Sequence, residues 1–511
     1  MGSTQYKNQE KTPLLDALTK FQKQDPAYFR IPAHRFERGI NSRFTDAVGE
    51  KIFRYDLSEA EGLDDLHHAT GAIKEAEELA ANLWQAKKSF FLVNGTTCGN
   101  EAMMLSAVKP GEKVMVMRNM HKSILMGLIL SGAVPCFVNP GYDPVWKLWC
   151  SITPEAIEHG FKENPDCKAV FLVSPNYYGI GSDLKKIADI CHQHGAILAV
   201  DEAHGSHLYF SEKLPLGALQ QNVDLCAQSI HKTAGSMTQS SILHIGSDRV
   251  DPAWVAANLQ LVQSTSPSYI LMTSLDAARQ ELAMHGEDMM EKAITLSEDM
   301  RSKLKEIPGI QVLEKVNLIF DLDITRVVFS AREYGISGYR LQELLYEAGG
   351  VSTELADEEN VVCVVTFANT KEDIERLIDT LTQIVTLHQR NPINKTQNNQ
   401  EELKPDERRL NYAQNSTISS EHTDIKIPEM VCTPREAYFH EKQTILWQEV
   451  TNKIAGEMIV PYPPGIPLIY PGERITPTIK QTIDHYLKKQ CVLHGPKDDK
   501  LTKYQIIPEI Q

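Results

Sequence analysis

The sequence predicts an α/β fold with a mostly parallel sheet. Between Thr70 and Leu275, short apolar segments alternate with segments of helical periodicity. This alternation is typical of βαβ units, in which helices cover both faces of a buried parallel sheet. The predicted strands are Ser89–Val93, Lys113–Met117, Val134–Val138, Ala169–Val173, Ala196–Val200 and Val223–Ala227.

Helical segments lie before and between these strands. They are predicted at Ala72–Ala86, Asn100–Ala107, Ser123–Ser131, Pro154–Asn164 and Leu184–His194. In an open sheet of this kind, ligands bind beyond the carboxyl ends of the strands. The polar residues that directly follow the strands are therefore candidates for a functional site.

Five parts are predicted along the chain. Residues 1–60 form an N-terminal arm, and residues 61–275 form the large domain that contains the sheet. A small α+β domain covers residues 276–390. Residues 391–428 are polar and almost free of aromatic side chains, which indicates a linker. Residues 429–511 form a further α+β domain.

The parts outside the sheet also carry helical patterns. The arm contains a short helix over Pro13–Gln24, and the small domain begins with a long helix over Leu275–Lys305 and ends with Lys371–Leu387. The C-terminal domain is expected to contain a helix over Pro434–Ile454. A segment dense in proline and glycine, PYPPGIPLIYPGE, follows that helix.

Charge and cysteine content limit the function classes. The formal net charge of −15 argues against nucleic-acid binding, which selects basic surfaces. It suits a small cationic substrate, or serves only to keep the protein soluble. The nine cysteines are scattered and form no C-x-x-C pair, so neither a disulfide framework nor a zinc or other metal site is expected.

The amino-acid pattern also bears on location. The N-terminal residues lack the apolar core of a secretory signal, and the longest apolar run, Ile124–Val138, is interrupted by glycines and a proline. We therefore expect a cytoplasmic protein with no membrane association.

The first candidate segment is Asn94–Asn100, NGTTCGN, which follows a strand and opens a helix. Its glycines, the hydroxyls of Thr96 and Thr97 and the free N–H groups of the helix N-terminus can hold a phosphate. The alternative is an ordinary helix cap.

Two further segments follow later strands. Asp201 comes directly after Ala196–Val200, and a carboxylate there can pair with a protonated pyridine nitrogen or only cap a turn. Ser229, His231 and Lys232 follow the last strand. Lys232 can form an imine if a desolvated, cationic environment lowers its pKa, and the alternative is a surface lysine. Ser229 and His231 offer hydrogen-bond donors to a phosphate.

A histidine completes the set. His121 follows the strand Lys113–Met117 in the segment His-Lys-Ser, where an imidazole can stack on a flat ring or cap a helix. The four segments occur in the order phosphate turn, stacking histidine, strand-end aspartate and then a lysine 31 residues after the aspartate. This order is the layout of a fold-type I enzyme that depends on pyridoxal 5′-phosphate.

The chain resembles the Orn/Lys/Arg decarboxylase family in its shorter form, which lacks an N-terminal wing domain, and within it the arginine decarboxylases. The resemblance rests on VNGTTCGNEAM, HKS, VSPNYYG, VDEAHGSH, SIHKTAGSMTQSS, QSTSPSYILMTSLDAAR and PYPPGIPLIYPGE. It implies an aspartate aminotransferase-like large domain that binds the cofactor. One departure is Pro32-Ala33-His34-Arg35, where the family often has Pro-Gly-His-Lys, so no role is carried over to the arm.

The resemblance implies a role for each matching residue. Lys232 binds the cofactor covalently, Asp201 holds its pyridine nitrogen and His121 stacks on its ring. Ala203 packs on the opposite face, with His204 beside the ring substituents. Thr96, Thr97, Ser229 and His231 bind the phosphate, and Thr265 and Ser266 reach the phosphate of a neighbouring subunit in a homodimer or higher oligomer.

The expected reaction is the decarboxylation of a basic amino acid, with arginine favoured and lysine or ornithine as alternatives. The product agmatine would enter polyamine biosynthesis. Lys232 and His204 are both candidates for the proton donor to Cα. A cationic side chain needs a carboxylate partner, and the candidates are Glu354, Glu457 and Glu473, each of which is otherwise a surface glutamate.

Two other functions are compatible with the same site residues. One is an aminotransferase or C–S lyase on the same fold, against which the C-terminal domain and the Ser-x-His-Lys segment argue. The other is a catalytically silent homologue that acts as a regulatory subunit, against which intact Lys232, Asp201 and His121 argue.

Overall fold

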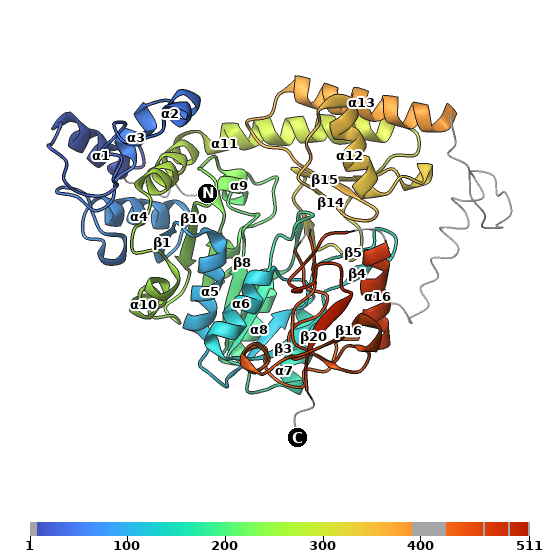
Figure 1. The fold of residues 1–511 in the computed structure, drawn as a ribbon. Helices are drawn as coiled ribbons and strands as arrows, with labels where there is room; N and C mark the ends of the chain where they lie inside the picture. Colours follow the sequence, from blue (N-terminus) through green and yellow to red (C-terminus); the bar gives the residue numbers. More distant parts are fainter. Residues whose placement is uncertain (1–7, 391–425, 463–464, 489–490, 509–511) are drawn as a thin grey trace.

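The computed structural model describes residues 8–390, 426–462, 465–488 and 491–508. Its centre is a seven-stranded sheet in the order β1-β10-β9-β8-β6-β2-β3 (Figure 1). The strands in that order are Lys88–Leu92, Ser241–Ile245, Leu225–Gln228, Ile197–Asp201, Ala169–Val173, Lys113–Met117 and Val134–Val138. Only β10 runs antiparallel to its neighbours within this sheet, which confirms the predicted mostly parallel α/β fold.

Apolar side chains on the two faces of the sheet enter different cores. On β1, Phe90 and Leu92 join the core formed with helices α5, α6, α7, α8 and α10, whereas Phe91 joins the core formed with α1, α4 and α11. Successive side chains of a strand point to opposite faces, so both faces are covered by helices. These helices are Gly95–Ala107 (α5), Lys122–Ser131 (α6), Pro154–Glu163 (α7), Leu184–Gln193 (α8), Pro252–Val262 (α10), Pro13–Lys23 (α1), Ala72–Leu83 (α4) and Tyr269–Glu306 (α11).

Helix α11 joins the sheet region to a second core. It is 38 residues long and extends from the large domain into the small domain (Figure 1). There it packs with α12 and α13 against a four-stranded antiparallel sheet in the order β11-β13-β15-β14. These elements are Gly338–Gly349 (α12), Lys371–Arg390 (α13), Gln311–Val312 (β11), Arg326–Ser330 (β13), Val361–Val364 (β15) and Leu355–Ala356 (β14).

The C-terminal domain is less helical than predicted. Helix α15 begins at Pro434 as expected but ends at Phe439, so the predicted helix to Ile454 is wrong. Residues Gln443–Leu446 instead form strand β16, which pairs with β20 (Lys503–Ile507), and β17 (Ile454–Ala455) pairs with the same strand. Helix α16, Pro477–Lys488, packs on this sheet. Of the predicted linker 391–428, residues 391–425 lie outside the described residues.

The N-terminal arm is held to α11 by a buried ion pair. Arg279 and Asp276 lie 2.6 Å apart and neither is exposed to solvent. Asp276 accepts a hydrogen bond from the backbone N–H of Leu14, and Arg279 donates to the carbonyl of Gln9. These bonds give both charged groups partners from the arm and fix the start of α1. Two short helices, α2 (Ser42–Val48) and α3 (Lys51–Tyr55), follow in the arm.

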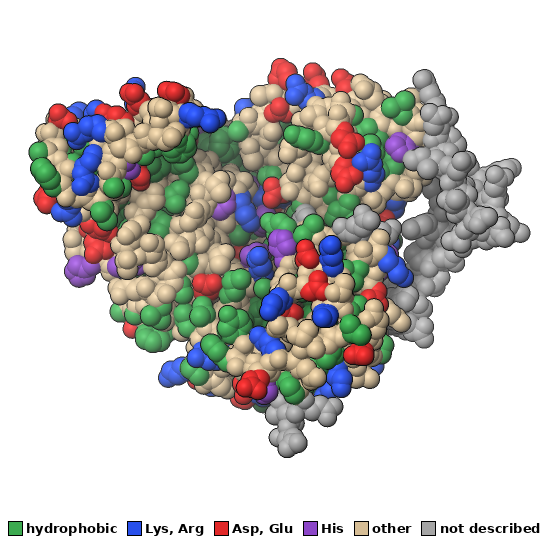
Figure 2. Space-filling view, viewed as in Figure 1, with side chains coloured by type: hydrophobic (Ala, Val, Ile, Leu, Met, Phe, Trp, Pro, Cys, Tyr) green, Lys and Arg blue, Asp and Glu red, His purple; other side chains and the backbone are tan. Residues whose placement is uncertain are grey.

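The surface in Figure 2 mixes acidic and basic side chains, without a large patch of one sign on that face. In the part of the chain that the structure describes, no helix is both long and apolar enough to span a bilayer. All nine cysteines lie in described segments, and none of them forms a disulfide there.

Candidate active site

The carboxyl ends of β2, β8 and β9 meet the N-terminus of α5 at one edge of the sheet. Asn100, on α5, donates from its amide to Asp201 at 2.8 Å and to the hydroxyl of Ser123 at 2.9 Å. The Ser123 hydroxyl in turn lies 2.9 Å from Nδ1 of His121. One hydrogen-bonded chain therefore connects three of the four segments selected from the sequence.

The fourth segment, which contains Ser229, is connected to the other three through buried hydroxyl groups at the start of α5. The Thr96 hydroxyl lies 2.6 Å from that of Ser229 and 3.0 Å from that of Ser241. Gly95 begins the helix with φ +72°, a conformation that favours glycine, and Asn94 makes no side-chain cap. Free N–H groups at a helix N-terminus beside hydroxyl donors suit a phosphate.

Two other predicted phosphate ligands lie in the same segments. Thr97 is half-buried in the first turn of α5, next to Thr96. Nδ1 of His231 lies 2.9 Å from the carbonyl oxygen of Ser240, which fixes the orientation of its imidazole ring. Burial lowers the pKa of His231, with the Ser240 carbonyl opposing that shift.

Asp201 occupies the last position of β8 and is almost completely buried. Its two carboxylate oxygens accept from the amide of Asn100 and, at 3.1 Å, from the backbone N–H of Ala203. A buried carboxylate needs such donors to remain charged. Ala203 is itself buried beside it, so both predicted residues lie at the same strand end.

Lys232 lies close to two aromatic side chains. Its ε-amine lies 3.0 Å from Nε2 of His204 and 6.0 Å from the ring centre of Tyr177. Burial lowers the pKa of Lys232, and the nearby cation Arg326 lowers it further, while the carboxylates Asp201 and Glu354 oppose the shift. Burial and the Lys232 charge also hold the pKa of His204 well below its usual value. The lysine therefore has a larger neutral, nucleophilic fraction than a surface lysine.

His121 is kept neutral at this edge of the sheet. Burial lowers its pKa to about 4, with the charge of Asp201 opposing the shift and that of Lys232 adding to it. Ser123 and Asn100 connect His121 to Asp201 through hydrogen bonds of 2.8 to 2.9 Å. A neutral imidazole can stack on a flat ring without adding charge to it.

Comparison with known proteins identifies the family. The model for the major domain of Orn/Lys/Arg decarboxylases matches residues 12–327, and the model for their C-terminal domain matches residues 417–494. The chain belongs to the Orn/Lys/Arg decarboxylase family.

Relatives within this family match nearly the whole chain. An arginine decarboxylase of Halalkalibacterium halodurans is 35% identical and one of Bacillus subtilis is 34% identical, each over 98% of this chain and at least 98% of the relative. The lysine decarboxylase LdcF of Francisella novicida has the same fold, with a TM-score of 0.81 at 21% identity, over 97% of this chain and 81% of that one. The fold class expected from the sequence is therefore confirmed.

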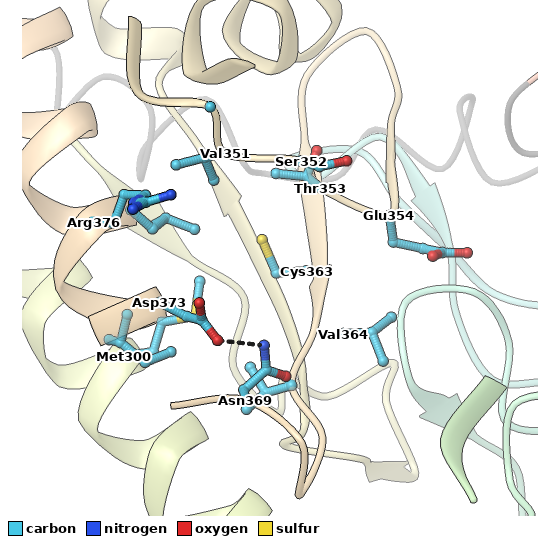
Figure 3. A pocket seen from close by; sticks show the side chains of 14 residues that line it. Met300, Val351, Ser352, Thr353, Glu354, Cys363, Val364, Asn369, Asp373 and Arg376 are labelled. Carbon is cyan, nitrogen blue, oxygen red and sulfur yellow. Dashed lines mark hydrogen bonds between the residues drawn. The ribbon is translucent and has the colours of Figure 1, made fainter. Parts of the chain in front are cut away.

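The three glutamates considered for substrate recognition lie in different surroundings. Glu354 is exposed at the edge of a cavity of about 360 Å³ that residues 350–354, β15 and α13 line. In Figure 3 its carboxylate points away from Cys363 and Arg376, toward the large domain. Its negative charge raises the pKa of Lys232 against the larger lowering by burial.

The other two glutamates are engaged within or beside the C-terminal domain. The carboxylate of Glu457 accepts from the backbone N–H groups of Lys497 and Gln505, and that of Glu473 is paired with Arg118. Thr265 and Ser266 are exposed on the loop before α11. The structure contains one chain, so the expected reach of these two residues into a neighbouring subunit stays a prediction.

The sequence alone gave no role to three residues of this site, Asn100, Tyr177 and Arg326. Asn100 ends the phosphate-turn segment, and its signal was an amide four residues after Thr96, on the same helix face. Tyr177 follows β6 in the segment VSPNYYG, where a strand end was the available signal. Arg326 begins β13 of the small domain and donates to the carbonyl of His204 at 3.2 Å. Nothing in the local sequence indicates that this contact forms.

Proposed function

We propose that this protein decarboxylates arginine to agmatine and CO2, with pyridoxal 5′-phosphate bound covalently at Lys232. The observation that carries the proposal is the position of a half-buried amine of lowered pKa at the same sheet edge as Asp201 and the Thr96 hydroxyl cluster. A flat ring with a phosphate group, an aldehyde and a basic nitrogen needs these three features together.

The residues present fit this cofactor. The start of α5 and the hydroxyls of Thr96 and Ser229 would hold its phosphate, Asp201 its ring nitrogen and His121 one face of its ring. The buried Nδ1 of His204 has no hydrogen-bond partner among the described residues, as expected of a group that faces a ligand. When bound, the cofactor supplies an electron sink for the pair of electrons that CO2 leaves behind.

The chain supplies orientation, charge and a proton. Asp201 keeps the ring nitrogen protonated, because its negative charge favours the cationic form. Lys232 and His204 lie 3.0 Å apart, beside the residues that would hold the cofactor, so either could deliver the proton that replaces CO2. We assign the proton to Lys232, because the low pKa of His204 leaves its imidazole unprotonated at neutral pH.

Glu354 is our candidate for the partner of the substrate side chain. Its carboxylate is exposed, points toward the large domain and acts on the charge of Lys232. A guanidinium binds a carboxylate through two parallel hydrogen bonds, which a primary ammonium cannot make. Arginine is favoured over lysine and ornithine also because the relatives at 34–35% identity over 98% of this chain are named arginine decarboxylases.

Three further statements belong to the same proposal. The protein acts in the cytoplasm, where its nine unbridged cysteines stay reduced. It supplies agmatine to polyamine biosynthesis. It works as a homodimer or higher oligomer, in which the exposed Thr265 and Ser266 face the phosphate site of a neighbouring subunit.

The direct test is CO2 release from arginine, lysine and ornithine by the holoprotein, beside a Lys232→Ala variant. We expect strong release from arginine, weak release from the other two and none from the variant. Lys185→Ala is a matched control, because Lys185 is an exposed lysine paired with Asp189 on α8. Keto-acid formation without CO2 would indicate an aminotransferase, and failure on all three amino acids would remove the substrate class.

A further inference from the structure

The most buried ion pair between the C-terminal domain and the large domain joins Glu473 to Arg118. The two guanidinium nitrogens lie 2.5 and 3.0 Å from the two carboxylate oxygens, so the pair is bidentate. The side chain of Arg118 is 8% exposed and that of Glu473 is not exposed at all. The residues are 355 positions apart in the sequence.

The surroundings of the pair leave few alternative positions for it. The guanidinium lies against the rings of Phe137 and Tyr470, at 4.8 and 4.5 Å from their centres, and the two rings contact each other with centres 4.7 Å apart. Arg118 also donates to the carbonyl of Leu468 at 3.1 Å, and Glu473 accepts from the backbone N–H of Tyr470 at 2.8 Å. Removing one partner of such a pair leaves a buried charge without compensation, which is strongly unfavourable.

On the large-domain side, the pair lies at the start of the loop that carries His121. Arg118 directly follows β2, and its backbone N–H donates to the carbonyl of Val138 at 2.8 Å. Two residues separate it from His121. Any displacement of the Arg118 side chain therefore acts on the backbone that sets the imidazole position.

In the C-terminal domain, Glu473 is the last residue of the proline-rich segment PYPPGIPLIYPGE. This segment also contacts the loop that carries His121. A β-carbon on Gly465 would lie 3.6 Å from Cδ2 of His121, so the Gly465 backbone runs along the edge of that ring. Lys122, the next residue, lies with its amine 5.9 Å from the ring centre of Tyr462. The ion pair thus fixes the C-terminal end of this segment at Glu473. Nearer its N-terminal end, Tyr462 and Gly465 lie against Lys122 and His121.

We propose that the Arg118–Glu473 pair is a positioning device through which the C-terminal domain sets His121 against the cofactor ring. The inference rests on the role proposed for His121 at the cofactor ring. Glu473 then acts in the reaction without touching substrate, in place of the substrate contact expected from the sequence. The large domain cannot hold His121 correctly unless the C-terminal domain is docked.

The test compares Glu473→Gln and Glu473→Asp with Glu429→Gln. Glu429 is a matched control, because it is an exposed glutamate paired with Arg474, the neighbour of Glu473. Hydrogen exchange of the cofactor-free chain is measured on peptides covering residues 118–131 and 326–364. The dissociation constant for pyridoxal phosphate and the kcat and KM for arginine are measured on the same proteins.

For Glu473→Gln we expect faster exchange in residues 118–131, no change in 326–364, and cofactor binding weaker by about tenfold to a hundredfold. Glu473→Asp keeps the buried negative charge beside Arg118, so the variant should fold. Its loss of cofactor affinity should be smaller than that of Glu473→Gln. Glu429→Gln should stay within about twofold of the wild type in every readout.

Wild-type cofactor affinity in either Glu473 variant would overturn the inference. So would exchange that rises equally in 118–131 and 326–364, because that pattern means general destabilisation. If the wild-type chain binds no pyridoxal phosphate, the proposed function fails. The exchange data of the cofactor-free chain would still show whether the pair controls the His121 loop.

Discussion

The ε-amine of Lys232 and Nε2 of His204 lie 3.0 Å apart, and the same burial lowers the pKa of both groups. Two cations at this distance would repel each other strongly in a buried site. The arrangement therefore disfavours two charged groups, and the lowered pKa of Lys232 gives its amine a larger neutral fraction than that of a surface lysine. The neutral form is the one a lysine needs to attack an aldehyde.

The first prediction concerns the pH at which Lys232 reacts. Glu354 raises the pKa of Lys232 against the larger lowering by burial, so Glu354→Gln should lower that pKa further. The reactive form is the neutral amine, whose fraction grows as pH rises through the pKa. The pH profile for capture of pyridoxal phosphate by the cofactor-free chain should therefore move to lower pH in the variant.

This profile can be measured as the rate of forming a borohydride-reducible adduct at each pH. Glu457→Gln serves as the control, since the Glu457 carboxylate is bound to the backbone of Lys497 and Gln505. Its profile should match the wild type. A shift of the Glu354→Gln profile to higher pH would show that Glu354 does not act on the amine as the structure indicates.

The second prediction concerns the carboxylate at the end of β8. Asp201→Asn removes the charge that stabilises a protonated ring nitrogen but keeps the size of the side chain. We expect cofactor binding to persist while kcat for arginine falls on the order of a hundredfold. Single-turnover CO2 release separates this loss from slow product release. A kcat within threefold of the wild type would remove Asp201 from the mechanism.

A milder companion variant is Asn100→Ala. It removes the amide that donates to Asp201 at 2.8 Å but leaves the carboxylate and its bond to Ala203. Its loss of kcat should lie between those of the wild type and Asp201→Asn. A larger loss than in Asp201→Asn would mean that Asn100 touches the substrate or cofactor directly.

Much of this site was predictable because it follows from strand ends. Strands β2, β3 and β6 match their predicted bounds to the residue, since buried parallel strands are continuous apolar runs. Asp201 and Lys232 then fall at the correct sheet edge. Strand β10 carries Ser241 and His244 among its apolar residues, and that mixed pattern gave no strand signal.

What the sequence did not predict depends on contacts between distant segments. Residues Gln443–Leu446 have a helical pattern, yet they pair with β20 near the C-terminus. Glu473 was one of three candidates for a substrate contact, and nothing nearby in the sequence reveals its pairing with Arg118. Arg326 was missed for the same reason, since it reaches the His204 carbonyl from the small domain. Local sequence patterns carry no information on such pairings.

The third prediction concerns stability and a buried carboxyl on α4. Burial raises the pKa of Glu77 to about 8, against the opposing hydrogen bond from the Phe91 N–H. The folded chain thus keeps a proton that the unfolded chain releases above its ordinary pKa of 4.5. Stability is lost as pH rises from about 4.5 to about 8, because the unfolded state binds fewer protons in that range.

Glu77→Gln should remove this loss, since the amide oxygen still accepts from Phe91 and carries no proton to release. We expect the variant to be more stable than the wild type by about 3 kcal/mol at pH 7 and equal to it near pH 4. Urea unfolding at both pH values measures the difference. Glu78→Gln, at the exposed neighbouring position, is the control, and a Glu77→Gln chain less stable at pH 7 would contradict the prediction.

The central claim is that the amine of Lys232 carries the cofactor. The most direct test is mass spectrometry of the holoprotein after borohydride reduction and proteolysis. We predict a pyridoxyl group on the peptide that contains Lys232, and none on any peptide of the Lys232→Ala variant. A pyridoxyl group on Lys122 or another lysine of the wild type, or on none, would contradict the account.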